Sequence, residues 1–207
     1  TREKIGYEKA GVLRAGIPVV CNDHQPPRSV LDEIKRLDCR HLQYQRDFDL
    51  RETTRDGIYE WRGNGFICRV VPPLPGVHQL QNLAGVIAGL SLLFPLQQIG
   101  AEAVAQNFAG TCLPGRFQHL DTDFGFDVYI DVGHNHDAAI ALAKNLELVK
   151  RAPGKLVILL GMLEDKESAK FVAELKDIVD EWWLLSLDCD RGLDADQLAE
   201  RVGSEVS

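Results

Sequence analysis

Hydrophobic positions in the first part of the chain change their spacing several times, and each change predicts a different element. A short apolar run at residues 16–22, followed by Asn-Asp and two prolines, is typical of a buried strand and a loop. Residues 29–37 carry apolar side chains at helical spacing, with Ser29 placed to cap the helix. In residues 40–45, apolar and polar side chains alternate enough to predict a second strand.

The next stretch, residues 49–72, has a period of two, which predicts strands. Asn64-Gly65 divides it and favours a hairpin turn. A proline-rich segment at residues 72–76 ends the predicted sheet. Two helical faces follow, formed by Leu80, Leu83, Ala84, Ile87 and Leu90 and then by Val104, Ala105 and Phe108.

After Pro114-Gly115, predicted strands alternate with predicted helices. The strands cover residues 128–130, 156–160 and 182–187, and the helices have apolar faces within residues 139–149, 171–178 and 195–202. This order predicts a parallel sheet with right-handed crossovers, as in a Rossmann-like domain. We therefore expect an α/β protein with a mixed unit over residues 1–112 and a Rossmann-like domain over residues 113–207.

Composition restricts the environment and the partners. The 207 residues are 45% hydrophobic and carry a formal charge of -8, which disfavours nucleic acid and anionic lipid as partners. The longest apolar stretches are too short or too interrupted to cross a bilayer, and the first residues lack a cleavable apolar region. The five cysteines are scattered and odd in number, which argues against a disulfide framework and a zinc site. We expect a cytoplasmic protein.

The stretch from Asp131 to Asn135 is the most informative candidate for chemistry. Asp131 follows a predicted parallel strand, and doubly wound sheets bind ligands at such strand ends. Its carboxylate could accept hydrogen bonds from ribose hydroxyls, and His134 could stack or donate. The alternative is that Asn135 or Asp131 only caps the next helix while His134 is a surface residue. The spacing by itself favours this alternative.

Three other side chains could bind a nucleotide or a metal, each with a simpler alternative. Arg116, in a Pro-Gly turn, could bind phosphate through its guanidinium, or be solvated or ion-paired. Asn82 could pair with an adenine edge, or be a helix cap or a surface group. Lys9, in a segment that we interpret as a compact turn, could pair with phosphate or be chemically modified. Its alternative is an exposed ion pair with Glu8.

Two motifs are absent and one charged segment is ambiguous. The sequence has no G-x-x-x-x-G-K-[ST], so it cannot bind triphosphate in the P-loop manner. No G-x-G-x-x-G follows the strand before Asp131, which disfavours an NAD-dependent oxidoreductase. Residues 161–166 follow a predicted strand and would lie on the ligand-binding side of the domain, as Asp131 does. The alternative is that their charges only cap and solvate the next helix.

Five motifs in order resemble the folylpolyglutamate synthase/dihydrofolate synthase family of the Mur ligase superfamily. They are I-G-Y-E-K-A-G-V at 5–12, N-L-A-G-V-I-A-G-L at 82–90, L-P-G-R-F-Q at 113–118, D-V-G-H-N at 131–135 and G-M-L-E-D-K-E at 161–167. Together they extend over nearly the whole chain. Two positions depart from the family pattern, since Gly133 stands in place of a usual Ala and His136 in place of a usual Pro.

The resemblance implies a fold and a reaction. Residues 1–112 would be the end of a Mur-ligase-type central ATPase domain, and residues 113–207 an incomplete Rossmann-like ligase domain with a mostly parallel sheet. The reaction would join L-glutamate to folate or dihydropteroate through an acyl phosphate, with ATP and Mg²⁺ as cofactors. The first residue is not Met, and the P-loop is missing. We therefore expect a monomeric fragment that is inactive without its N-terminal P-loop portion.

The resemblance also assigns residues. Lys9 matches a lysine that is carbamylated and helps to hold magnesium, while Asn82, Arg116 and Asp131 match ATP-contacting positions. His134 matches the adjoining motif histidine, which we group with Lys9 as catalytic. A non-catalytic nucleotide-binding or interaction module and another Mur-type amino-acid ligase stay open as alternatives. The residues do not distinguish a dihydrofolate synthase from a folylpolyglutamate synthase or a bifunctional enzyme.

Overall fold

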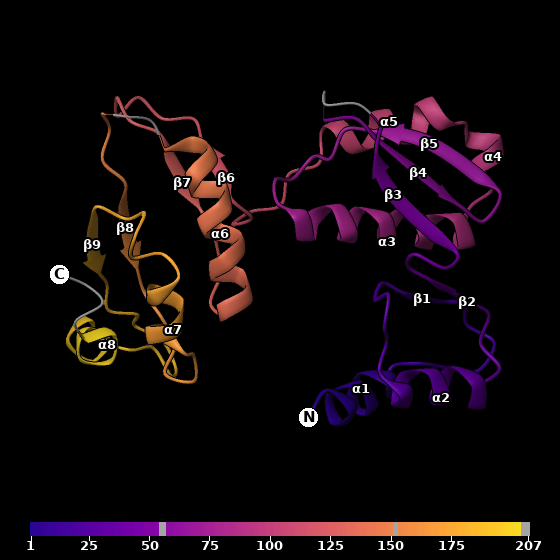
Figure 1. Ribbon diagram of the computed structural model, residues 1–207, viewed down its shortest axis with the longest axis horizontal. Helices are drawn as coiled ribbons and strands as arrows, with labels where there is room; N and C mark the ends of the chain where they lie inside the picture. Colours follow the sequence, from indigo (N-terminus) through magenta and orange to yellow (C-terminus); the bar gives the residue numbers. More distant parts are fainter. Residues whose placement is uncertain (54–56, 151–152, 204–207) are drawn as a thin grey trace. The chain divides into compact units, whose positions relative to one another are not determined.

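The computed structural model describes residues 1–53, 57–150 and 153–203. These residues form two compact units (Figure 1). The first combines Thr1–Pro73 with Val77–Thr111, and the second combines Leu74–Gly76 with the described residues from Cys112 onward. Each unit has its own cluster of buried apolar side chains. Among the described residues, no helix is both long and apolar enough to span a membrane.

The first unit begins with two helices and a small parallel sheet. Its elements are α1 (Arg2–Ala10), β1 (Val19–Cys21), α2 (Arg28–Arg36) and β2 (His41–Gln43). The predicted helix and the two predicted strands are confirmed, and β1 pairs with β2 in parallel. The interpretation of residues 5–11 as a compact turn is wrong, because they lie largely within α1. A Cβ on Gly6 would lie 2.7 Å from both Pro27 Cβ and Ser29 Oγ, so glycine allows α1 to pack closely on α2.

The cap of α2 also differs from the expectation. Ser29 does not cap the helix, since its hydroxyl donates to the Glu3 carbonyl at 2.9 Å. The Glu3 carboxylate of α1 instead accepts the free backbone N–H groups of Arg28 and Ser29, at 3.1 and 3.0 Å. These two bonds lower the pKa of the Glu3 carboxyl, because they favour its charged form. A side chain from the neighbouring helix thus replaces a local cap.

A three-stranded antiparallel sheet and three helices complete the first unit. They are β3 (Phe48–Glu52), β4 (Tyr59–Gly63), β5 (Phe66–Val70), α3 (Val77–Leu93), α4 (Leu96–Ile99) and α5 (Ala101–Ala109). The Asn64-Gly65 turn is confirmed, with positive φ at both residues. Figure 1 shows α3 along the sheet β3-β4-β5. The indole of Trp61 is fully buried and donates to the Ala84 carbonyl of α3 at 3.0 Å, which joins sheet and helix.

The second unit alternates short strands and helices, as predicted. Its elements are β6 (Gln118–Leu120), β7 (Val128–Ile130), α6 (His136–Val149), β8 (Val157–Leu160), α7 (Ser168–Ala173), β9 (Glu181–Leu184) and α8 (Ala195–Val202). β8 pairs with β9 in parallel, whereas β7 pairs antiparallel with β6. The α/β class is confirmed, but the expectation of a parallel partner for β7 is corrected. The three-residue β6 was not predicted from the sequence.

Candidate functional site

The carboxylate of Asp131 joins two loops of the second unit. It follows β7 and accepts two backbone N–H groups, that of Phe117 at 2.8 Å and that of Gly133 at 2.7 Å. Each carboxylate oxygen takes one of these bonds and is free to accept another. The side chain is exposed and does not cap α6. Asp131 therefore holds its own loop against the turn that carries Arg116.

That turn has an unusual backbone. The Arg116 N–H donates to the Leu113 carbonyl at 3.3 Å, and both Gly115 and Phe117 have positive φ, at +70° and +46°. A left-handed conformation is uncommon for a residue as large as Phe117. Its ring is buried and stacks on Tyr129, with the ring centroids 4.7 Å apart. The backbone N–H of Val132 also donates to the Gly115 carbonyl, at 2.9 Å.

The guanidinium of Arg116 is exposed at the tip of this turn. In the part of the chain that the structure describes, it makes no hydrogen bond and no ion pair. The predicted turn is confirmed, and of the two local alternatives the structure favours a solvated side chain over an ion-paired one. Five N–H donors are thus available to an anion.

His134 and Asn135 follow at the start of α6. Asn135 is the N-cap, since its side chain accepts the Ala138 N–H at 2.9 Å. The Nδ1 atom of His134 lies 2.9 Å from the Val132 carbonyl, which can only accept, so Nδ1 carries the hydrogen. In the neutral ring Nε2 is then an acceptor, and it has no partner among the described residues. The capping alternative is confirmed for Asn135, while His134 keeps a free ring nitrogen.

Asn82 and Lys9 lie in the first unit. Asn82 is the sixth residue of α3, so it is not a helix cap. It is exposed, and its amide nitrogen donates to Gln79 Oε1 at 3.1 Å while its amide oxygen faces no donor of the described residues. Lys9 is exposed in the last turn of α1. The alternative of an ion pair with Glu8 is wrong, and the Lys9 ammonium has no partner within the described ranges.

Two carboxylates of the charged segment after β8 form ion pairs. Asp165 pairs with Lys166 at 2.9 Å and with Arg191 at 3.5 Å, and Glu167 pairs with Lys170. The hydrogen bond from Lys166 lowers the pKa of the Asp165 carboxyl, with a further contribution from the positive charges nearby. The simpler alternative holds in part, since these charged side chains lie at the start of α7, but among the described residues no side chain caps that helix.

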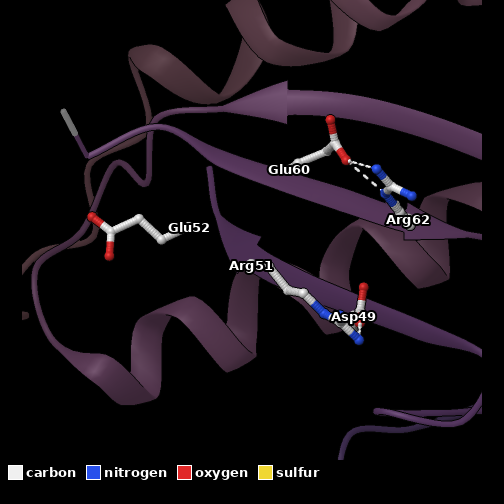
Figure 2. Close-up of a pocket in the computed structure, with 5 residues that line it drawn as sticks. All are labelled: Asp49, Arg51, Glu52, Glu60 and Arg62. Atoms are coloured by element: carbon white, nitrogen blue, oxygen red, sulfur yellow. Dashed lines mark hydrogen bonds and ion pairs between the residues drawn. The ribbon is translucent and has the colours of Figure 1, made fainter. Parts of the chain in front are cut away.

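A charged hollow lies over β3 and β4, and none of its lining residues was singled out by the sequence (Figure 2). Its lining residues are Asp49, Arg51, Glu52, Glu60 and Arg62. Arg51 pairs with Asp49 and Arg62 with Glu60, each at 2.5 Å. The bond from Arg62 lowers the pKa of the Glu60 carboxyl. Because opposite charges already satisfy one another here, the hollow is a weak candidate for a ligand site.

The structure thus brings Arg116, Asp131 and His134 together in the second unit, and it places Lys9 and Asn82 in the first. Sequence reasoning missed Phe117, whose backbone N–H links the turn to Asp131. Its positive φ has no signature in the sequence, because the residue is not glycine. Among the described residues, no group of three or more His, Cys, Asp or Glu side chains is arranged to hold a metal ion.

Comparison with known families identifies this arrangement. Residues 115–207, which contain the Arg116 turn and the Asp131 loop, match the family described as Mur ligase, glutamate ligase domain. Residues 115–207 are therefore similar to a Mur-ligase-type domain. The dihydrofolate synthase/folylpolyglutamate synthase of Haemophilus influenzae is 31% identical over 221 residues, which cover 99% of this chain and 49% of the relative. The predicted resemblance to these synthases is confirmed.

Solved structures of similar proteins extend the likeness to the whole chain. Escherichia coli FolC in complex with DHPP and ADP is 26% identical with a TM-score of 0.81, and the match covers 98% of this chain and 47% of that one. A bifunctional folylpolyglutamate synthase/dihydrofolate synthase with Mn, AMPPNP and L-glutamate bound is 31% identical with a TM-score of 0.79, covering 99% and 47%. The chain therefore spans about half the length of the relatives that it matches.

Proposed function

We propose that this chain is part of an ATP-dependent ligase that adds L-glutamate to a folate or dihydropteroate carboxylate, and that it supplies several of the side chains that contact the nucleotide. Residues 1–112 would be the end of the central ATPase domain, and residues 113–207 the glutamate ligase domain. The observation that carries the proposal is the unpaired Arg116, presented on a turn that is bonded to the D-V-G-H-N loop. The nucleotides named for the solved relatives support it.

The proposed reaction has two steps with balanced atoms. A carboxylate oxygen of the folate substrate attacks the γ-phosphorus of ATP, which gives an acyl phosphate and ADP. The amine of L-glutamate then attacks the acyl carbon, loses a proton, and displaces inorganic phosphate to leave an amide. Negative charge develops on the transferred phosphoryl group, so fixed positive groups accelerate the first step.

Each site residue has a role that its observed contacts permit. Arg116 has free donors and would bind nucleotide phosphate as a bidentate partner. Asp131 has one unused acceptor position on each oxygen, which suits ribose hydroxyls. Asn82 has a free amide oxygen for the adenine amino group. His134 has a free Nε2 that can accept a proton or a hydrogen bond near the reacting phosphate.

Lys9 would contribute to magnesium binding as a carbamate. Its ammonium is exposed and unpaired among the described residues, so carbon dioxide can reach it and no ion pair has to be broken. Carbamylation replaces a positive charge with an anionic oxygen ligand, the type that magnesium prefers. Bound magnesium would neutralise phosphate charge. Lys9 alone cannot complete an octahedral site, so further ligands would come from water, the phosphates and residues outside this chain.

The experiment is an assay of glutamate-dependent ADP release by the complete gene product that contains this sequence. Dihydropteroate and tetrahydrofolate are offered separately, which distinguishes the synthase activities. We expect ADP release that requires both L-glutamate and a pterin substrate, and we expect none from the purified 207-residue chain. Nucleotide binding without ligation by the complete protein would favour the alternative of a binding module.

A further inference from the structure

We infer that Asp131 is a positioning residue that sets the direction of Arg116, in addition to any contact with the nucleotide; this inference rests on the proposed function. Asp131 and Phe117 are 14 residues apart along the chain, yet the carboxylate of Asp131 accepts the N–H of Phe117, the residue directly after Arg116. The position of the Arg116 main chain therefore depends on Asp131.

Three hydrogen bonds around Asp131 make the two loops one structural piece. Phe117 N–H and Gly133 N–H donate to its two oxygens at 2.8 and 2.7 Å, and Val132 N–H donates to the Gly115 carbonyl at 2.9 Å. Two of these bonds hold the neighbours of Arg116: one holds Gly115, the residue before it, and the other holds Phe117, the residue after it. A turn fixed at both neighbours restricts where the guanidinium can point.

The conformation of Phe117 explains why the turn requires such a carboxylate. Its φ of +46° is unfavourable for a residue with a Cβ, and persists only where the surroundings determine it. Two groups do so here: the Asp131 carboxylate on the Phe117 N–H, and Tyr129 against the buried ring. Without the carboxylate, the backbone can relax to a negative φ, and Arg116 would turn with it.

The charges in this region agree with a positioning role. Asp131 and Arg116 lie on bonded loops and carry opposite charges, yet they form no ion pair. The carboxylate oxygens accept backbone N–H groups instead, and the donors of the guanidinium stay free. A direct Asp131–Arg116 ion pair would compete with a phosphate for the same donors. The observed geometry therefore keeps Arg116 fixed in position but open to an anion.

A double-mutant cycle on the complete protein tests this inference, with ADP as the probe and its Kd measured by calorimetry. Asp131→Asn keeps the shape but offers one acceptor and one donor to two N–H groups, so one bond is lost. We expect Asp131→Asn to raise the Kd by about tenfold in the native background. In the Arg116→Ala background the same change should raise the Kd by a clearly smaller factor, because the residue that Asp131 positions is gone and only its direct contact with the ribose is left to weaken.

The possible outcomes separate the inference from the proposed function. If Arg116→Ala leaves the Kd unchanged, Arg116 does not contact the nucleotide, and both ideas fail. If Arg116→Ala weakens binding but Asp131→Asn has the same effect in both backgrounds, Asp131 acts independently and the positioning role is overturned while the nucleotide site stands. Asp180→Asn is the matched control: Asp180 also accepts a backbone N–H, from Leu156, and pairs with Lys150, outside the two loops. It should leave the Kd unchanged.

Hydrogen exchange of the native complete protein provides a test that needs no variant. The backbone amides of Phe117 and Gly133 both lie in loops, where exposed amides exchange rapidly. If both donate to Asp131, their exchange is slowed by at least about tenfold relative to exposed loop amides such as that of Gly125. Exchange at the same rate as Gly125 would overturn the inference, even if the Asp131 variant failed to fold.

Discussion

Replacement of Gly115 by Ala tests the close approach of the two loops of the second unit. A Cβ at this position would lie 2.6 Å from Val132 Cγ1, and Gly115 has a φ of +70°. The left-handed conformation costs an alanine about 1–2 kcal/mol. Moving the half-exposed Val132 side chain out of its rotamer costs a further ~0.5–1.5 kcal/mol. We therefore expect Gly115→Ala to lower the free energy of unfolding of the second unit by about 1.5–3.5 kcal/mol.

Gly125→Ala separates the two contributions to this loss. Gly125 has nearly the same conformation, with a φ of +77°, but nothing lies within 4 Å of a Cβ placed there. Its replacement should cost only the conformational term, about 1–2 kcal/mol. Thermal unfolding measured by tryptophan fluorescence provides the comparison, at about 4–8 °C per kcal/mol for a unit of this size. Equal losses in the two variants would refute the close contact between Gly115 and Val132.

Three further predictions concern the first unit. Lys9→Ala in the complete protein should lower turnover by about a hundredfold or more, with partial recovery on adding acetate, because the change removes the proposed carbamate ligand of magnesium. Lys4→Ala on the same helix is the control, and full activity of Lys9→Ala would contradict the carbamate. Glu3 has a lowered pKa through its bonds to Ser29 and Arg28, so its stabilising effect is present above about pH 4.3 and is lost as the pH falls through the folded value. Glu3→Gln should therefore reduce the acid dependence of urea unfolding, and superimposable pH profiles would argue against the cap. Trp61→Phe removes the hydrogen bond to Ala84 and part of a buried ring, so the free energy of unfolding should fall by about 1–3 kcal/mol, whereas an unchanged urea midpoint would contradict the buried bond.

The elements that depend on local pattern could be predicted from the sequence. Asn64-Gly65 requires positive φ at two residues and so predicts a tight hairpin. The apolar residues of α3 and α6 recur at helical spacing over many positions, so the sequence predicts both segments as helices. In contrast, α1 contains Gly6, which is a poor helix former and is required by close packing against α2. Packing between elements is not visible in local spacing.

The candidate site could be predicted in part, for the same reason. The Pro-Gly sequence predicts the turn at Arg116, and the end of a predicted strand draws attention to Asp131. The bond between them could not be predicted, because it depends on the antiparallel pairing of β7 with the short β6 and on a left-handed Phe117. Sequence reasoning considered Asp131 only as a ligand contact or a cap. The structure gives it a third role, as the acceptor that joins the two loops.

The measurement that most directly tests the central claim follows oxygen from substrate to phosphate. The complete protein is given ATP, L-glutamate and a folate or dihydropteroate substrate labelled with ¹⁸O in the reacting carboxylate, and the inorganic phosphate is analysed by mass spectrometry. The account predicts that one labelled oxygen appears in the phosphate for each amide formed, because the acyl phosphate carries that oxygen away when the glutamate amine attacks. Amide formation that yields only unlabelled phosphate would contradict the acyl phosphate route, and no amide formation with any pterin substrate would contradict the assignment as a glutamate ligase.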